Sequence, residues 1–161
     1  MQNGHLRRKL TERLIGAFIL WARRRAPRRR RMLTFAGDFT LSRFEFLWLD
    51  EKATPGGTRP QNRPPWWRPF NMFLHCWRPD HDGEEFHDHS RWSITICLRG
   101  RLLERMPQRE PRPLTPGSIV FRSHKAIHAF DIPKGHSGKT WTLFIVGRRN
   151  HRQSPYRFKQ N

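Results

Sequence analysis

The 161-residue sequence is poor in the residues that build disulfide scaffolds, acidic surfaces and membrane spans. Its two cysteines, Cys76 and Cys97, do not form a CxxC pair, so a disulfide framework is excluded and both are expected to be reduced core residues. Only 13 residues are acidic, which excludes an acidic tail. The longest apolar run, residues 14–22, is far shorter than the roughly 20 residues of a transmembrane helix, and no small-residue cleavage site follows it. We therefore predict a cytoplasmic protein without a transmembrane segment.

Basic residues dominate the charge and gather near the N-terminus. The formal net charge is +19, while seven Trp and twelve Phe supply enough large apolar side chains for a folded core. Residues 1–31 contain ten Arg and one Lys against a single Glu, a net charge of +10, which favours contact with a nucleic acid or an anionic membrane. The residues expected to make such contact are Arg23, Arg24, Arg25, Arg28, Arg29, Arg30 and Arg31.

One helix is predicted over residues 5–25. It is indicated by apolar residues that recur at helical spacing, namely Leu10, Leu14, Phe18 and Trp21. Pro27 is expected to end the helix, and the other helical face is basic. Two interpretations remain open: the helix packs its apolar stripe on the domain, or it is an interfacial membrane helix or nucleic-acid arm.

Short runs of β-forming residues follow, separated by turns. Strands are predicted at Phe44–Leu49, Asn71–Trp77, Trp92–Leu98, Leu102–Arg105, Ser118–Phe121, Ala126–Phe130 and Trp141–Val146, with a Pro- and Gly-rich loop over residues 53–65. In the run at residues 92–98, Ile94 and Ile96 fall on one face, and Thr95 and Cys97 fall on the other. Many short strands without intervening helices predict a mainly β fold, an antiparallel sandwich or barrel.

Histidines form the strongest candidate site. His87 and His89 are an HxH pair, and side chains two residues apart in a strand point to the same face, which brings two imidazoles together as metal ligands. His128 follows Gly117 by eleven residues, at the far end of a strand–turn–strand segment. His124, in the connecting turn, is a fourth candidate ligand.

The spacing around these histidines resembles the two motifs of the cupin superfamily of double-stranded β-helix barrels. The first motif is matched by HDGEEFHDHSRWSITICLRG, which ends at Gly100 and has Ser93 where the motif has Glu. The second is matched by GSIVFRSHKAIHAFDI, with Gly117 and His128 in register. The chain also resembles small bacterial and phage cupin proteins that have a basic amphipathic N-terminus and a closing segment like WTLFIVGRR. The resemblance spans about residues 70–147.

A cupin resemblance implies a divalent metal, Fe²⁺, Mn²⁺, Ni²⁺ or Zn²⁺, held by His87, His89 and His128. A three-histidine set is similar to that of the thiol dioxygenases, which implies a metal-dependent oxygenase or isomerase acting on a small anionic molecule. Arg101 and Arg122 are the candidates for orienting such a substrate. The thiol dioxygenases also use a tyrosine to assist the reaction. The single tyrosine of this chain, Tyr156, lies in the C-terminal tail and is not assigned that role.

The predicted organisation is one barrel with appendages. A basic helical arm is expected over residues 1–31, a strand and loop over 32–69, a cupin core over 70–149 and a basic tail over 150–161. The alternative function is a non-catalytic binding or structural protein, related to phage proteins, that docks on nucleic acid, membrane or a larger assembly through the arm. Cupins often pair through an edge strand, so a homodimer is a further candidate state.

Overall fold

A computed structural model of the chain describes residues 2–26, 28–33, 39–45, 70–78, 86–89 and 91–147. The predicted Pro- and Gly-rich loop and the C-terminal tail, including Tyr156, lie outside these ranges. The described elements are α1 (Gln2–Arg25), β1 (Arg28–Leu33), β2 (Phe39–Glu45), β3 (Phe70–Trp77), β4 (Ser93–Arg99), β5 (Leu102–Met106), β6 (Arg109–Leu114), β7 (Ile119–Arg122), β8 (Ala129–Asp131) and β9 (Thr140–Gly147).

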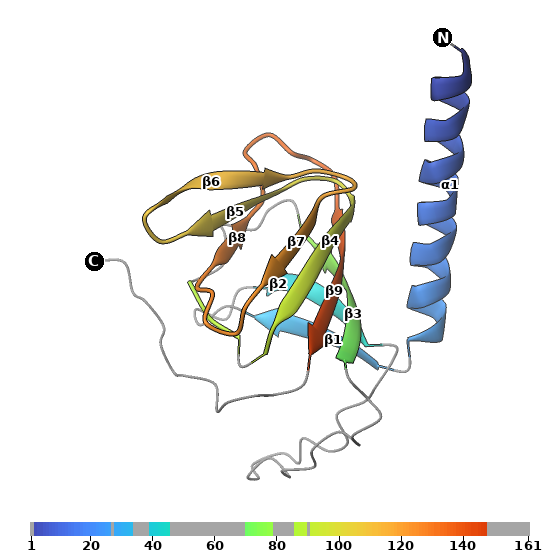
Figure 1. The fold of residues 1–161 in the computed structure, drawn as a ribbon. Helices are drawn as coiled ribbons and strands as arrows, with labels where there is room; N and C mark the ends of the chain where they lie inside the picture. Colours follow the sequence, from blue (N-terminus) through green and yellow to red (C-terminus); the bar gives the residue numbers. More distant parts are fainter. Residues whose placement is uncertain are drawn as a thin grey trace.

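The strands form two antiparallel sheets that face each other (Figure 1). One sheet has the order β1-β2-β3-β9-β4-β7, and the other has the order β6-β5-β8. Strands far apart in the sequence are neighbours, since β9 pairs with both β3 and β4. The prediction of a mainly β antiparallel sandwich or barrel is therefore confirmed.

Two strands that were not predicted have unusual sequences. β6 contains Pro111 and Pro113, which cannot donate backbone hydrogen bonds, and it is the outermost strand of the smaller sheet. β1 begins with four consecutive arginines, residues 28–31, and it is the outermost described strand of the larger sheet. Outer strands need hydrogen-bond partners on one side only and tolerate residues of low β propensity, so propensity patterns miss them.

The N-terminal region differs from the single basic arm that was predicted through Arg31. Helix α1 ends at Arg25, and the next four arginines, Arg28 to Arg31, belong to β1, which pairs with β2. The barrel sheet thus begins at Arg28 and not at residue 70. Within the described chain, α1 is not long and apolar enough to cross a membrane. The cytoplasmic location remains a prediction.

Side chains of β3 alternate between the two faces of the larger sheet. Leu74 and Cys76 pack with Ile19 and Ala22 of α1, so the helix covers the outer face of this sheet. On the inner face, His75 stacks with Phe144 of β9 at a ring-centroid distance of 5.1 Å. Helix α1 therefore packs on the domain, but of the predicted apolar stripe only Phe18 takes part, and Leu10, Leu14 and Trp21 are exposed.

The inner face of β4 consists of small side chains. Ser93, Thr95 and Cys97 are all buried, whereas Ile94 and Ile96 on the other face are half-buried. The alternation predicted for this strand is present, and its more polar face is the one that points into the barrel. Small inward side chains leave the space in which the larger histidine and arginine side chains of neighbouring segments lie.

Candidate metal centre

Backbone pairing holds two of the predicted histidines opposite each other. His87 and His128 form an isolated antiparallel bridge, in which the N–H of each residue donates to the carbonyl oxygen of the other at 3.0 Å. His128 immediately precedes β8, and His89 follows His87 by two residues. The bridge therefore fixes the relative position of two segments that are about 40 residues apart in the sequence.

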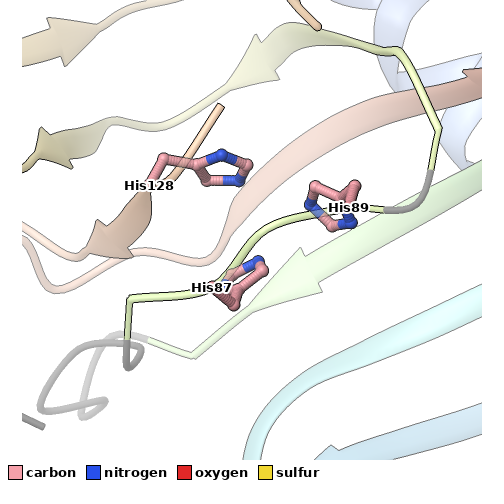
Figure 2. Close-up of side chains that lie close together, drawn as sticks. All are labelled: His87, His89 and His128. Carbon is pink, nitrogen blue, oxygen red and sulfur yellow. The ribbon is translucent and has the colours of Figure 1, made fainter. Parts of the chain in front are cut away.

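The three imidazoles converge (Figure 2). The ring centroids of His87 and His89 are 4.9 Å apart, those of His87 and His128 are 4.8 Å apart, and those of His89 and His128 are 5.1 Å apart. One ring nitrogen from each lies within 4.8 Å of the others. A divalent ion about 2.1 Å from each nitrogen needs donors no more than about 4.2 Å apart, so small rotations of the imidazoles would close the group around an ion.

Burial keeps the imidazoles of His89 and His128 in the neutral form that binds metals. His128 is buried, and both of its ring nitrogens lack a hydrogen-bond partner among the described residues. Burial, followed by the charges of Arg122 and of the other two site histidines, holds the pKa of His128 well below its usual range. Burial lowers the pKa of His89 to about 3, with further contributions from His87, Arg122 and Arg43. Two neutral buried imidazoles with a third beside them form a donor set that fits a divalent metal ion.

Aromatic rings and a fourth histidine enclose the centre. Phe144 lies 5.4 Å from His89, and Phe130 lies 5.2 Å from His128, measured between ring centroids. His75 of β3 accepts a hydrogen bond at its Nε2 from Nε of Arg43, at 3.2 Å. Burial, then Arg43 and then His89, hold the pKa of His75 well below its usual value, so this imidazole is also neutral.

Arg122 lies inside the barrel, where a buried carboxylate holds it. Its Nε donates to Oε1 of Glu104, and its Nη1 donates to Oγ1 of Thr95 at 2.7 Å. Arg112 also donates to Glu104, from Nε to Oε2 at 3.1 Å. Arg122 is thus committed to an ion pair that links β7 to β5, and this binding restricts its predicted role in orienting a substrate.

The other two predicted site residues are not brought into the histidine group. Arg101 has an exposed side chain, and its backbone N–H donates to Oγ1 of Thr140 at 3.1 Å. His124 lies in the turn after β7 and is not one of the three residues whose ligand atoms come together in the described chain.

Sequence patterns missed three residues around the centre: Arg43, His75 and Glu104. His75 could have been found, because it alternates with Leu74 and Cys76 in a predicted strand and so had to share a face with other inward side chains. Glu104 shares the inward face of LLERM with Leu102, but an acidic residue at such a position gives no sign of the two arginines that neutralise it.

Comparisons with known proteins support the fold. No protein-family model matches the chain, and no curated protein matches it. Among solved structures, a cupin-like protein from Thermotoga maritima has a TM-score of 0.50 and 15% identity, over 66% of this chain and 68% of that chain. A protein from Photorhabdus luminescens has a TM-score of 0.50 and 15% identity, over 73% of this chain and 80% of that chain.

A third similar structure is the DMSP lyase DddQ from Ruegeria pomeroyi, with 23% identity and a TM-score of 0.43. That match covers 49% of this chain and 38% of the lyase. The two longer matches establish that the chain has the cupin fold, as its sequence motifs predicted. A shared fold at such low identity does not transfer an activity.

Proposed function

We propose that the protein binds one divalent metal ion through His87, His89 and His128 and acts there on a small anionic molecule. The observation that carries the proposal is the state of His128, whose two buried ring nitrogens have no hydrogen-bond partner in the described chain. A buried polar atom without a partner is costly in free energy, by about 1–3 kcal/mol, and a bound metal would remove part of that cost.

The protonation state of the site supports metal binding at neutral pH. Since the pKa of His89 is lowered to about 3, protons do not compete for its imidazole near neutrality. Imidazole ligands suit Fe²⁺, Mn²⁺, Ni²⁺ and Zn²⁺, so the donor set does not choose among them. When bound, such an ion would supply Lewis-acid or oxygen-activating chemistry, which suits an oxygenase or an isomerase.

The charges around the histidines support an anionic substrate. Arg43 and Arg122 both lie close enough to His89 to lower its pKa, so two guanidinium groups create a positive potential at this side of the centre. Because Glu104 already holds Arg122, Arg43 is the better candidate for orienting an anion. Its neighbour His75 would hold the Arg43 guanidinium in place through their hydrogen bond.

The test is metal content per chain, measured by elemental analysis on protein purified without a histidine tag. We expect near-stoichiometric metal in the natural protein and loss of it in His87→Ala/His128→Ala. His124→Ala is the matched control, since it removes a nearby histidine outside the group and should retain the metal. Absence of metal from the natural protein after reconstitution with each of the four ions would contradict the proposal.

The alternative, a non-catalytic protein that docks through its N-terminal region, is supported by a separate observation. Arg24 and Arg25, in the last turn of α1, have exposed side chains. Arg24→Ala/Arg25→Ala should weaken such docking while leaving the metal content of the barrel unchanged, so the two functions can be measured independently.

A further inference from the structure

Helix α1 has an exposed apolar stripe next to the apolar face that it buries on the barrel. On one side, Ile19 and Ala22 are buried against the barrel, and Ile15 and Phe18 pack beside them. A helix that only covered the barrel would be polar on the rest of its surface. Instead, several of its largest apolar residues do not take part in this contact.

The apolar stripe next to the buried face is exposed. Leu10, Leu14 and Trp21 are 58%, 62% and 52% exposed, and Leu20 is 46% exposed. A helix turns about 100° per residue, so Leu10, Leu14 and Trp21 lie in one stripe roughly 16 Å long. Figure 1 shows α1 along the outside of the barrel, with no other described element on its far side. Leu10, Leu14 and Trp21 are called the outer stripe below, and Leu20 lies outside it, beyond Arg13 and Arg24.

Arginines border the outer stripe. By the same helical periodicity, Arg13 and Arg24 lie on one side of it and Arg25 lies on the other, and all three side chains are exposed. The single acidic residue of the helix, Glu12, falls on the opposite side of the cylinder. Arg23 differs from these three, since its guanidinium lies 5.7 Å from the ring centroid of Trp141 in the barrel. The outer stripe is therefore apolar at its centre and positively charged at its margins.

We infer that the outer stripe docks on an anionic lipid bilayer, with α1 lying flat on the membrane surface beside the barrel. Leucine side chains would enter the acyl boundary, Trp21 would sit at the headgroup level, and the bordering arginines would contact anionic headgroups. The barrel would then be held at the membrane through the neighbouring, buried face of the same helix.

Charge and burial favour this occupant over the two others that were considered. A nucleic acid would satisfy the arginines with phosphates but would leave the leucines in water. A second copy of the helix would bury the leucines but would bring arginines from both copies into proximity, which is unfavourable. An anionic bilayer satisfies the apolar centre and the positive margins together, and the inference does not depend on the metal function.

The experiment is co-sedimentation of the full-length protein with phosphatidylcholine vesicles that contain or lack phosphatidylglycerol. We expect binding to the anionic vesicles, a reduction of at least about tenfold in affinity for Leu14→Ser/Trp21→Ser, and weaker binding as salt rises. A matched control is Ile119→Ser/Phe121→Ser on β7, which removes two apolar side chains that are 69% and 65% exposed and are not bordered by the helix arginines. This control should bind like the natural protein.

Three outcomes would overturn the inference. The first is absence of binding to anionic vesicles by the natural protein. The second is equal vesicle binding by the natural protein and Leu14→Ser/Trp21→Ser. The third is a lower oligomeric mass for Leu14→Ser/Trp21→Ser than for the natural protein, measured by sedimentation equilibrium, when the natural protein binds no vesicles. This result would mean that the outer stripe contacts a second copy of the chain. Unchanged circular dichroism of each variant verifies that it is folded, and metal content reports separately on the barrel site.

Discussion

Gly100 ends β4 in a backbone conformation that favours glycine. Its φ is +84°, and a Cβ built on it would lie 2.4 Å from Oγ1 and 2.7 Å from Cα of Thr140. The Thr140 hydroxyl accepts the N–H of Arg101 and donates to the carbonyl oxygen of the same residue. Glycine is thus required here both for conformation and for the close approach of Thr140, which explains its place in the sequence motif.

Replacement of this glycine gives a residue-scale prediction. Gly100→Ala should lower the free energy of unfolding by about 3 kcal/mol, from strain at positive φ together with steric overlap. Gly117→Ala is the matched control, because Gly117 has a φ of +92° but open space around its Cβ position, so it should cost only about 1 kcal/mol. Denaturant unfolding of both variants checks this, and equal losses would show that overlap with Thr140 is unimportant.

The candidate metal-binding histidines were predictable from sequence, because their spacing along the chain is enough to identify them. Two imidazoles at i and i+2 and a third at the motif distance are local sequence features, and the structure brings His87, His89 and His128 together. Arg43 and His75 could not be paired from sequence, because they meet through the register of β2 against β3. That register depends on the whole sheet and leaves no local pattern.

At the scale of elements, Glu104 connects three strands. It lies on β5 with no exposed side-chain surface, and it receives hydrogen bonds from Arg112 on β6 and Arg122 on β7. Because β5 and β7 belong to different sheets, the Glu104–Arg122 ion pair joins the two sheets of the barrel. Forming a buried ion pair adds little net stability, because both charges lose their hydration. Removing one partner lowers the free energy of unfolding strongly, because the other charge stays buried without a counter-charge.

Removing the carboxylate gives an element-scale prediction. Glu104→Leu should destabilise the fold by about 3 kcal/mol, since it leaves the buried Arg122 guanidinium without its counter-charge. Glu104→Leu/Arg122→Leu should recover part of this loss, because no uncompensated charge remains in the barrel. Thermal and denaturant unfolding measure both variants. A double variant less stable than Glu104→Leu would mean that Arg122 has a stabilising role apart from this pair.

Strand prediction succeeded where alternation is clear and failed at the margins of the sheets. β3, β4, β5, β7, β8 and β9 all correspond to predicted strands. β6 and β1 were missed because prolines and consecutive arginines are poor β-formers, and only hydrogen bonds to an inner neighbour make them strands. These bonds come from tertiary pairing, which a local window of sequence does not contain.

At the scale of the whole molecule, buried neutral histidines make stability depend on pH. His89 has a pKa of about 3 in the folded protein against 6.5 for an exposed histidine, and the pKa of His75 is also well below 6.5. Between these values the unfolded chain binds more protons than the folded one, so stability is present above pH 6.5 and is lost as the pH falls towards 3.

The metal-free protein should therefore become less stable on acidification below pH 6.5. Each such histidine contributes up to about 1.4 kcal/mol per pH unit to the slope. The measurement is the urea midpoint as a function of pH in the presence of a chelator. His75→Gln removes one titrating group, so it should give a shallower slope than the natural sequence, and an unchanged slope would show that His75 is not kept neutral by the fold.

The position of β1 has a consequence for how the molecule avoids aggregation. Its four consecutive arginines lie on the outermost described strand of the larger sheet, where an open row of backbone groups would otherwise accept another chain. Two molecules approaching edge to edge would bring together two segments that each carry four positive charges, and this repulsion acts before any hydrogen bond can form. Its reach shortens from about 30 Å at 0.01 M salt to about 3 Å at 1 M. Concentrated salt, which usually keeps basic proteins in solution, would therefore remove the protection of this edge.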